Sequence, residues 1–252
     1  MRFQAVSVVA AASLASAITP AGFQPASQNT LVVQYGNQVV TSGQVLARNA
    51  TQVQPTIGTT QRLPGTYAVV MVDLDIPTDA PPRTNTLLHW LQTGLTSSQQ
   101  PTRSGTNGTG LFLLQNTQQA APLSEYIGPN PPARAPLSHR YTFILVDHSN
   151  ITAQGLQALT AATQERIGFN AQSVLSAAGL GPQTVLAGNF FNVTNPGPLA
   201  GTGPNGTLPN GTTPNGSSGS GTSVPAGAVA GAGVGLGAVL AAVLASVLAG
   251  VL

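Results

Sequence analysis

The sequence predicts a mainly β domain with a large antiparallel sheet and a few peripheral helices. Two observations support this fold class. Several segments rich in Val, Leu and aromatic residues are separated by long connections of Pro, Gly and Thr. Helix patterns are short and come late in the chain, whereas an alternating βαβ sheet would need them between successive strands.

The individual elements follow from local patterns. The strongest strand patterns cover residues 67–72, 87–95, 111–115 and 141–146, with weaker ones at 31–33 and 39–40. A helix is expected over residues 171–178, because Ala171, Val174 and Leu175 have helical spacing. Asn170 can cap its start, and Gly179 stands at its C-terminal end.

Composition excludes several classes of protein. Only 6% of the 252 residues are charged, against roughly 25% in ordinary soluble domains. The formal net charge of +2 supplies no basic patch, so nucleic-acid binding is not expected. The chain has no cysteine, which excludes disulfides, thiol catalysis and cysteine-ligated zinc.

Residues 1–17 have the features of a secretory signal peptide. Arg2 gives a positive start, residues 5–14 are apolar, and Ala15-Ser16-Ala17 resembles a cleavage site. A membrane helix, the alternative, would need roughly 20 apolar residues. We therefore expect a secreted protein whose folded domain covers residues 18–198.

The C-terminal residues 226–252 consist of Ala, Gly, Val and Leu apart from Ser246. This length could span a bilayer, but no basic residue flanks it. Small residues, a polar spacer and an apolar tail are typical of a GPI-attachment signal, with Ser217, Ser218 and Gly219 as candidate attachment residues. We expect membrane attachment through a GPI anchor at the cell surface, on the plasma membrane or cell wall; a retained transmembrane helix is the alternative.

Residues 199–225 form a Pro, Asn, Gly and Thr-rich stalk that contains a repeated Pro-Asn-Gly-Thr/Ser unit. Each repeat is an Asn-x-Ser/Thr glycosylation sequon, and four further sequons lie upstream. The sequence thus predicts a glycoprotein with candidate sites at Asn49, Asn107, Asn150, Asn192, Asn205, Asn210 and Asn215.

Two of three candidate chemical clusters lie on the expected central strands. Asp73 and Asp75 follow an apolar run, and their spacing of two places both carboxylates on one side of an extended chain. Pro77 then ends the strand. A solvated strand end is the alternative for the acids, and a buried core residue is the alternative for His89, which has apolar neighbours.

The third cluster combines a Gly-Pro-rich loop, residues 126–132, with the start of a strong strand. His139 and Tyr141 share one face of that strand, so an imidazole and a phenol can face the same pocket. Two imidazoles, the Tyr141 hydroxyl and the Gly128 amide could offer hydrogen-bond donors to a phosphate oxygen, while a carboxylate fixes a histidine tautomer from behind.

The ordered motifs Asp-x-Asp-x-Pro (73–77), Leu-His-Trp-Leu (88–91), Tyr-x-Gly-Pro-x-Pro-Pro (126–132) and His-Arg-Tyr (139–141) resemble the phosphatidylethanolamine-binding protein family over residues 28–193. The resemblance implies a large sheet packed on a smaller one and a small anion pocket. The pocket would be lined by Asp73, Asp75, Pro77, His89, Gly128, Pro131, Pro132, His139 and Tyr141. Leu74 and Asn130 depart from the family pattern, where proline and glycine are common.

The resemblance implies a non-catalytic protein without metal or cofactor, whose partner is a phosphate-containing small molecule or a phospholipid headgroup. Inhibition of a secreted serine protease, such as a serine carboxypeptidase, is an alternative that the family also offers. A His/Asp hydrolase is less favoured, because the sequence has no Gly-x-Ser-x-Gly motif and no His-Glu-x-x-His motif.

Overall fold

The computed structural model describes residues 18–103 and 110–197. The expected signal peptide, the stalk and the C-terminal tail lie outside these residues. So do the candidate attachment residues and four of the seven sequons, namely Asn107, Asn205, Asn210 and Asn215. The predictions for all of these remain predictions.

Strands dominate the described residues. They are β1 (Val32–Tyr35), β2 (Gln38–Val39), β3 (Gln44–Leu46), β4 (Thr56–Thr59), β5 (Tyr67–Pro77), β6 (Thr84–Ser97), β7 (Thr102–Arg103), β8 (Gly110–Gln115), β9 (Ser138–Asp147) and β10 (Val185–Thr194). The helices are α1 (Ala153–Ala162) and α2 (Ala171–Ala177), with short 3-10 helices η1 (Arg48–Thr51) and η2 (Pro182–Thr184).

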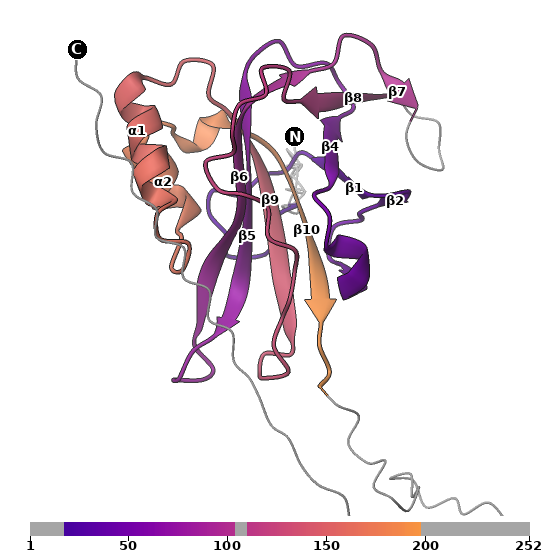
Figure 1. The fold of residues 1–252 in the computed structure, drawn as a ribbon, viewed down its shortest axis with the longest axis vertical. Coiled ribbons are helices and arrows are strands. Elements are labelled where there is room, and N and C mark those ends of the chain that lie inside the picture. The colour runs from indigo at the N-terminus through magenta and orange to yellow at the C-terminus, as the bar shows by residue number, and fades with distance from the viewer. Residues whose placement is uncertain (1–17, 104–109, 198–252) are drawn as a thin grey trace, which may run out of the picture. The chain divides into compact units, whose positions relative to one another are not determined.

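The strands form a large and a small sheet, as predicted, but the two are joined. The large sheet has the order β6-β5-β9-β10-β3, and the small sheet the order β2-β1-β4-β8. Strand β8 pairs with the end of β6 at Thr96 and Ser97, which makes one curled path (Figure 1). The mainly β fold is confirmed, and β3 adds a parallel pairing to β10.

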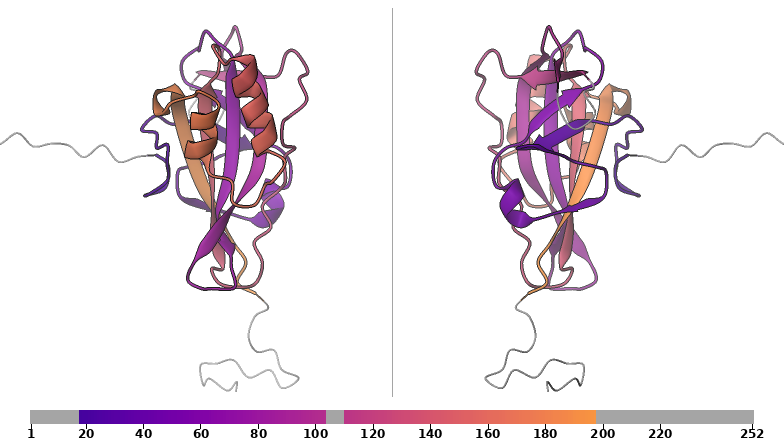
Figure 2. Two further views of the ribbon diagram at one scale, coloured as in Figure 1. Left: turned by 90° about the vertical axis from the view of Figure 1, so that its left-hand side faces the viewer. Right: turned by 90° about the vertical axis from the view of Figure 1, so that its right-hand side faces the viewer.

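The large sheet is buried on both faces because its strands alternate apolar residues to each side. On β5, Val69 and Met71 pack into the core shared with the small sheet. Val70 and Val72 face the opposite way, into a second core with helix α2. Figures 1 and 2 show the helices over one face of the large sheet and the small sheet over the other.

Helix α2 begins and ends as the sequence predicts. The Asn170 side chain accepts a hydrogen bond from the Ser173 backbone N–H, and Gly179 has a left-handed φ of 75°. Helix α1 was not predicted, in part because Gly155 lowers helix propensity. The structure gives the reason for that glycine: a Cβ there would collide with the Ala178 carbonyl.

Strand β10 was also not predicted as a strand, although its residues contribute to the family resemblance. Gly188 and Asn189 interrupt its apolar pattern, and both residue types are uncommon in strands. Gly188 fits because the Thr19 side chain packs closely against it, and Asn189 is buried with its Nδ2 donating to the Leu31 carbonyl at 2.8 Å. Within residues 18–103 and 110–197, no helix is long and apolar enough to cross a membrane.

Candidate functional site

Four of the predicted site residues meet at one end of the large sheet. Asp73 on β5 pairs with Tyr141 on β9, and His139 lies two residues before Tyr141 on the same face. His89 projects from β6, the strand on the other side of β5. All four side chains are almost completely buried. Antiparallel register thus brings together groups that are up to 68 positions apart in the printed sequence (Asp73 to Tyr141).

Both histidines are held through their Nδ1 atoms. His139 Nδ1 lies 2.7 Å from Asp73 Oδ2, and His89 Nδ1 lies 2.6 Å from the Ile127 carbonyl oxygen. Asp73 Oδ2 is also 4.0 Å from His89 Nε2. The expected carboxylate support therefore applies to His139, whereas a loop carbonyl orients His89.

Three polar atoms at this site have no hydrogen bond of good geometry: His89 Nε2, His139 Nε2 and the Tyr141 hydroxyl. The Tyr141 hydroxyl approaches Asp73 and the Asn130 backbone, and both influence it electrostatically. Buried polar groups without partners are uncommon in native proteins, and they cluster where a ligand or water completes them. These three atoms are therefore the polar groups of the cluster that lack a partner within the protein.

Burial governs the acid–base properties of the site. Loss of solvent lowers the pKa of His89 below its usual value, although the Ile127 carbonyl and Asp73 partly oppose this. Burial, reinforced by Asp73, raises the pKa of Tyr141 well above its ordinary range. The phenol is therefore a neutral hydrogen-bonding group at physiological pH, and His89 is neutral over most of that range.

The Tyr141 ring packs against a layer of other aromatic side chains. The rings of Tyr141 and Phe191 stack with their centroids 5.4 Å apart, and Tyr35 meets Phe191 edge-on at 5.5 Å. The Tyr35 and Tyr126 hydroxyls are 2.9 Å apart, and Tyr126 donates to the Thr51 carbonyl at 2.7 Å. Burial raises the pKa of Tyr126 to about 12, so these phenols are structural hydrogen-bonding groups.

The Gly-Pro-rich loop is anchored at several points. Gln52 Nε2 donates to the Pro129 carbonyl at 2.9 Å, and Asn195 Nδ2 donates to the Pro131 carbonyl at the same distance. Gly128 is required by close packing, because a Cβ there would lie 2.9 Å from the Gln52 Cα atom. Pro131 is buried in this arrangement, while Pro132 is exposed.

Asp75 and Pro77 are not brought to the histidines in the same way. The Asp75 carboxylate accepts three hydrogen bonds from Arg140: from its backbone N–H and Nε at 2.8 Å and from Nη2 at 2.7 Å. A register irregularity between Asp73 and Ile76 accompanies this turn toward Arg140. Pro77 ends β5, opposite Thr84. The spacing of two predicted that the carboxylates of Asp73 and Asp75 lie on the same side of the strand. The register irregularity and the pairing with Arg140 determine where the Asp75 carboxylate lies.

A family comparison matches residues 25–191, more than half of the chain, to the phosphatidylethanolamine-binding protein model. The chain belongs to the phosphatidylethanolamine-binding protein family. No functionally curated protein matches the sequence. The resemblance found from the ordered motifs is therefore confirmed by an independent match over the same region.

Several solved structures are similar to this family member. A carboxypeptidase Y inhibitor in complex with its cognate proteinase is 19% identical, with a TM-score of 0.46 over 66% of this chain and 83% of that one. A phosphatidylethanolamine-binding protein from Plasmodium vivax is 20% identical, with a TM-score of 0.46 over 69% and 91%. The Plasmodium falciparum protein is 21% identical, with a TM-score of 0.44 over 65% and 83%.

The structure assigns roles to several residues whose roles the sequence motifs did not predict. Ile127 contributes only its carbonyl oxygen, which no side-chain motif can signal. Arg140 stood within a recognised motif, but its pairing with Asp75 depends on strand register. Gln52 and Asn195 lie far from the loop in sequence and reach it only in the folded chain.

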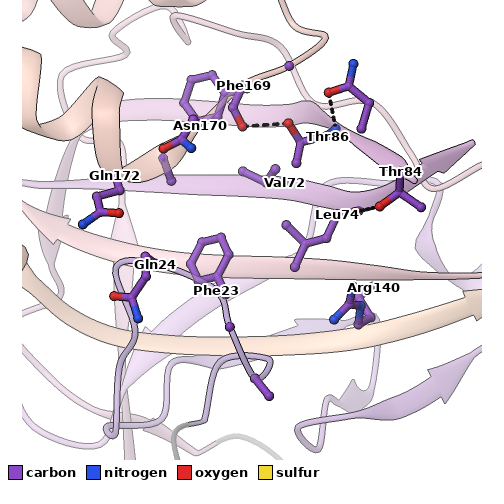
Figure 3. Close-up of a pocket in the computed structure, with 15 residues that line it drawn as sticks. Phe23, Gln24, Val72, Leu74, Thr84, Thr86, Arg140, Phe169, Asn170 and Gln172 are labelled. Carbon is purple, nitrogen blue, oxygen red and sulfur yellow. Dashed lines mark hydrogen bonds between the residues drawn. The ribbon is translucent and has the colours of Figure 1, made fainter. Parts of the chain in front are cut away.

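A cavity of about 570 Å³ lies on the face of the large sheet opposite the histidines (Figure 3). Phe23, Val72 and Phe169 provide apolar lining, and Arg140 lines it while paired to Asp75. Leu74, which departs from the family pattern, lines this cavity and packs with the second core. Its side chain therefore borders this cavity and not the histidine cluster, as strand alternation requires.

Proposed function

We propose that this protein is a non-catalytic binding protein whose ligand is a small oxyanion, such as phosphate or a phospholipid headgroup. The observation that carries the proposal is the group of three unpartnered, buried polar atoms from His89, His139 and Tyr141. Side chains held this rigidly lose little entropy when a ligand binds, which favours affinity. The Gly-Pro-rich loop beside them is fixed from two sides, which adds to this preorganisation.

The same geometry gives little support to hydrolysis. A serine-type triad needs a hydroxyl group hydrogen-bonded to the imidazole that activates it. In the part of the chain that the structure describes, the hydrogen bonds of His89 and His139 go to Ile127 and Asp73 and to no hydroxyl. That part also contains no cluster of three or more His, Asp or Glu suited to a metal ion.

Binding is tested by titration calorimetry with phosphoethanolamine between about pH 5 and pH 8. We expect affinity to increase as the pH falls, because a protonated imidazole attracts an anion. Burial lowers the pKa of His89, so its contribution appears below the ordinary histidine value of about 6.5. His139→Ala should lose binding, whereas Asp79→Asn, an exposed carboxylate at the β5–β6 turn, should retain it. A flat pH profile together with normal binding by His139→Ala would contradict the proposal.

We also propose that the protein is secreted, glycosylated and held at the cell surface by a GPI anchor. These features rest on the sequence of residues 1–17 and 199–252. Phosphatidylinositol-specific phospholipase C should release the protein from intact cells. Retention after this treatment would favour a transmembrane helix or a wall linkage instead.

Inhibition of a serine carboxypeptidase remains the alternative function. It is tested by incubating the secreted protein with extracellular serine carboxypeptidases at micromolar concentration and measuring residual peptidase activity. Dose-dependent inhibition that survives His139→Ala would indicate a surface separate from the histidine site. Unchanged peptidase activity would leave ligand binding as the function.

A further inference from the structure

The cavity of Figure 3 lies where the second core reaches the surface of the domain. Its floor is apolar, because Phe23, Val72 and Phe169 are buried members of that core and Leu74 is half-buried beside them. A volume of about 570 Å³ is within the range of small-molecule binding sites. Strand alternation places this floor on the opposite side of β5 from the histidine cluster, so the two regions are separate.

Arg140 is the charged group among the described residues that line this cavity. A guanidinium group presents its N–H donors along the edges of a rigid plane. The Asp75 carboxylate occupies one edge, because its two oxygens accept from Nε and Nη2. The Arg140 side chain is 40% exposed, and Nη1 has no hydrogen-bond partner within residues 18–103 and 110–197. The free edge, formed by Nη1 and the other N–H of Nη2, can therefore hold a second carboxylate through two parallel hydrogen bonds.

Amide side chains lie at the other end of the cavity. In Figure 3, Gln24 and Gln172 are at one end and Arg140 is at the other, with Phe23 and Leu74 between them. Both glutamines are exposed, and their side chains make no hydrogen bond within the part of the chain that the structure describes. A carboxamide both donates and accepts, so these side chains can bind an amide group of a ligand. No Asp or Glu is among the described lining residues, so the cavity wall itself does not repel a carboxylate.

We propose that this cavity binds a small amphipathic carboxylate of the N-acyl amino acid type. Its carboxylate pairs with the free edge of Arg140, its apolar side chain covers Phe23 and Leu74, and its amide lies near the glutamines. Because Asp75 already balances the charge of Arg140, the cavity favours a single carboxylate over a doubly charged anion. This site is additional to the oxyanion site of the proposed function and does not depend on it.

A set of matched probes separates these contributions. N-acetylphenylalanine carries the carboxylate, the amide and the apolar side chain; N-acetylphenylalaninamide has a neutral group in place of the carboxylate; and N-acetylglycine lacks the apolar side chain. Saturation-transfer difference NMR on the full protein should give N-acetylphenylalanine a Kd of about 1 mM or tighter. Each of the other probes should bind about tenfold or more weakly, because charged hydrogen bonds or apolar burial are lost. Equal affinity of the acid and its amide, or no binding of the acid at about 10 mM, would overturn the inference.

Inorganic phosphate distinguishes this cavity from the histidine cluster. At constant ionic strength, the affinity for N-acetylphenylalanine should be the same with and without phosphate, because the two ligands occupy opposite faces of the large sheet. Displacement of the probe by phosphate would place it at the histidine cluster, which would overturn the inference and leave the proposed function standing. Binding of the probe by a protein that binds neither phosphate nor phosphoethanolamine would support the inference and contradict the proposed function alone.

Two variants locate the probe in the cavity. Leu74→Ala shortens the apolar floor and should weaken N-acetylphenylalanine binding about threefold or more. Leu156→Ala is the matched control and should leave the affinity unchanged, because Leu156 is 40% exposed on α1 and does not line the cavity. Arg140→Gln should bring the acid-to-amide affinity ratio to about one, because the guanidinium edge is lost. An unchanged affinity in Leu74→Ala, or an unchanged ratio in Arg140→Gln, would overturn the inference. If Arg140→Gln fails to fold, Leu74→Ala and the wild-type probe comparison still decide.

Discussion

Substitution of Asp75 by Asn tests whether this carboxylate stabilises the fold or binds the ligand. The Asp75 carboxylate accepts three hydrogen bonds from Arg140, two of them from the guanidinium group. An Asn side chain keeps one acceptor oxygen, but its NH₂ group replaces the other and meets an N–H donor. The ion pair is lost, and at least one guanidinium hydrogen bond is lost with it.

The cost can be estimated from the burial of each partner. Removing one member of a fully buried ion pair destabilises a protein by about 3–5 kcal/mol. The Asp75 side chain is 10% exposed, but that of Arg140 is 40% exposed, so water can solvate the freed guanidinium. We therefore expect a loss of about 2 kcal/mol in the free energy of unfolding, which corresponds to a fall in Tm of about 4–8 °C for a domain of this size.

Thermal and urea denaturation followed by circular dichroism measure this loss. Asp79→Asn is the matched control, because the Asp79 carboxylate is fully exposed beside Arg134 and its removal should not change the Tm. Phosphate affinity of folded Asp75→Asn should remain within about threefold of wild type, since the carboxylate faces Arg140. A variant with wild-type Tm and abolished phosphate binding would refute this reasoning and return Asp75 to the binding site.

Three further predictions concern positions outside the histidine cluster. Burial lowers the pKa of His148, so the unfolded state binds a proton more readily, and the urea midpoint should fall as the pH drops below about 6.5. An unchanged midpoint at pH 5 would contradict this. Gly128→Ala should cost about 1–3 kcal/mol, seen as a lower Tm, because its Cβ would collide with Gln52. Glycopeptide mass spectrometry should find the exposed Asn150 occupied and Asn192 empty, since Asn192 Nδ2 donates to the Gly43 carbonyl at 2.7 Å. Occupancy at Asn192 would show that this hydrogen bond does not protect the site.

The sequence predicted strands that contain a strong apolar run and missed elements whose pattern is interrupted by glycine or polar residues. β5 and β9 contain long apolar runs, because a strand that is buried on both faces needs apolar residues at nearly every position. Strand β10 is equally central, but Gly188 and Asn189 break its pattern for reasons of packing and hydrogen bonding across the sheet. Local patterns carry no information about such long-range contacts.

The motifs predicted which residues form the site better than they predicted the partner of each side chain. The motifs named Asp73, His89, His139 and Tyr141, and strand register does place these four together. The motifs also named Asp75, whose carboxylate the structure assigns to Arg140. Two acids at a spacing of two share a face only in a regular strand, and β5 is irregular between Asp73 and Ile76.

The sequence by itself determined the fold class, the family and the residue types available for chemistry, because ordered motifs and apolar periodicity are local properties of the chain. Only the tertiary structure decided which atom of each histidine faces the site. The Ile127 carbonyl and the Asp73 carboxylate hold the two Nδ1 atoms, so the Nε2 atoms are the ones left without a hydrogen-bond partner. The partner of each ring nitrogen is supplied by folding, and it cannot be read from the histidine's own neighbours in sequence.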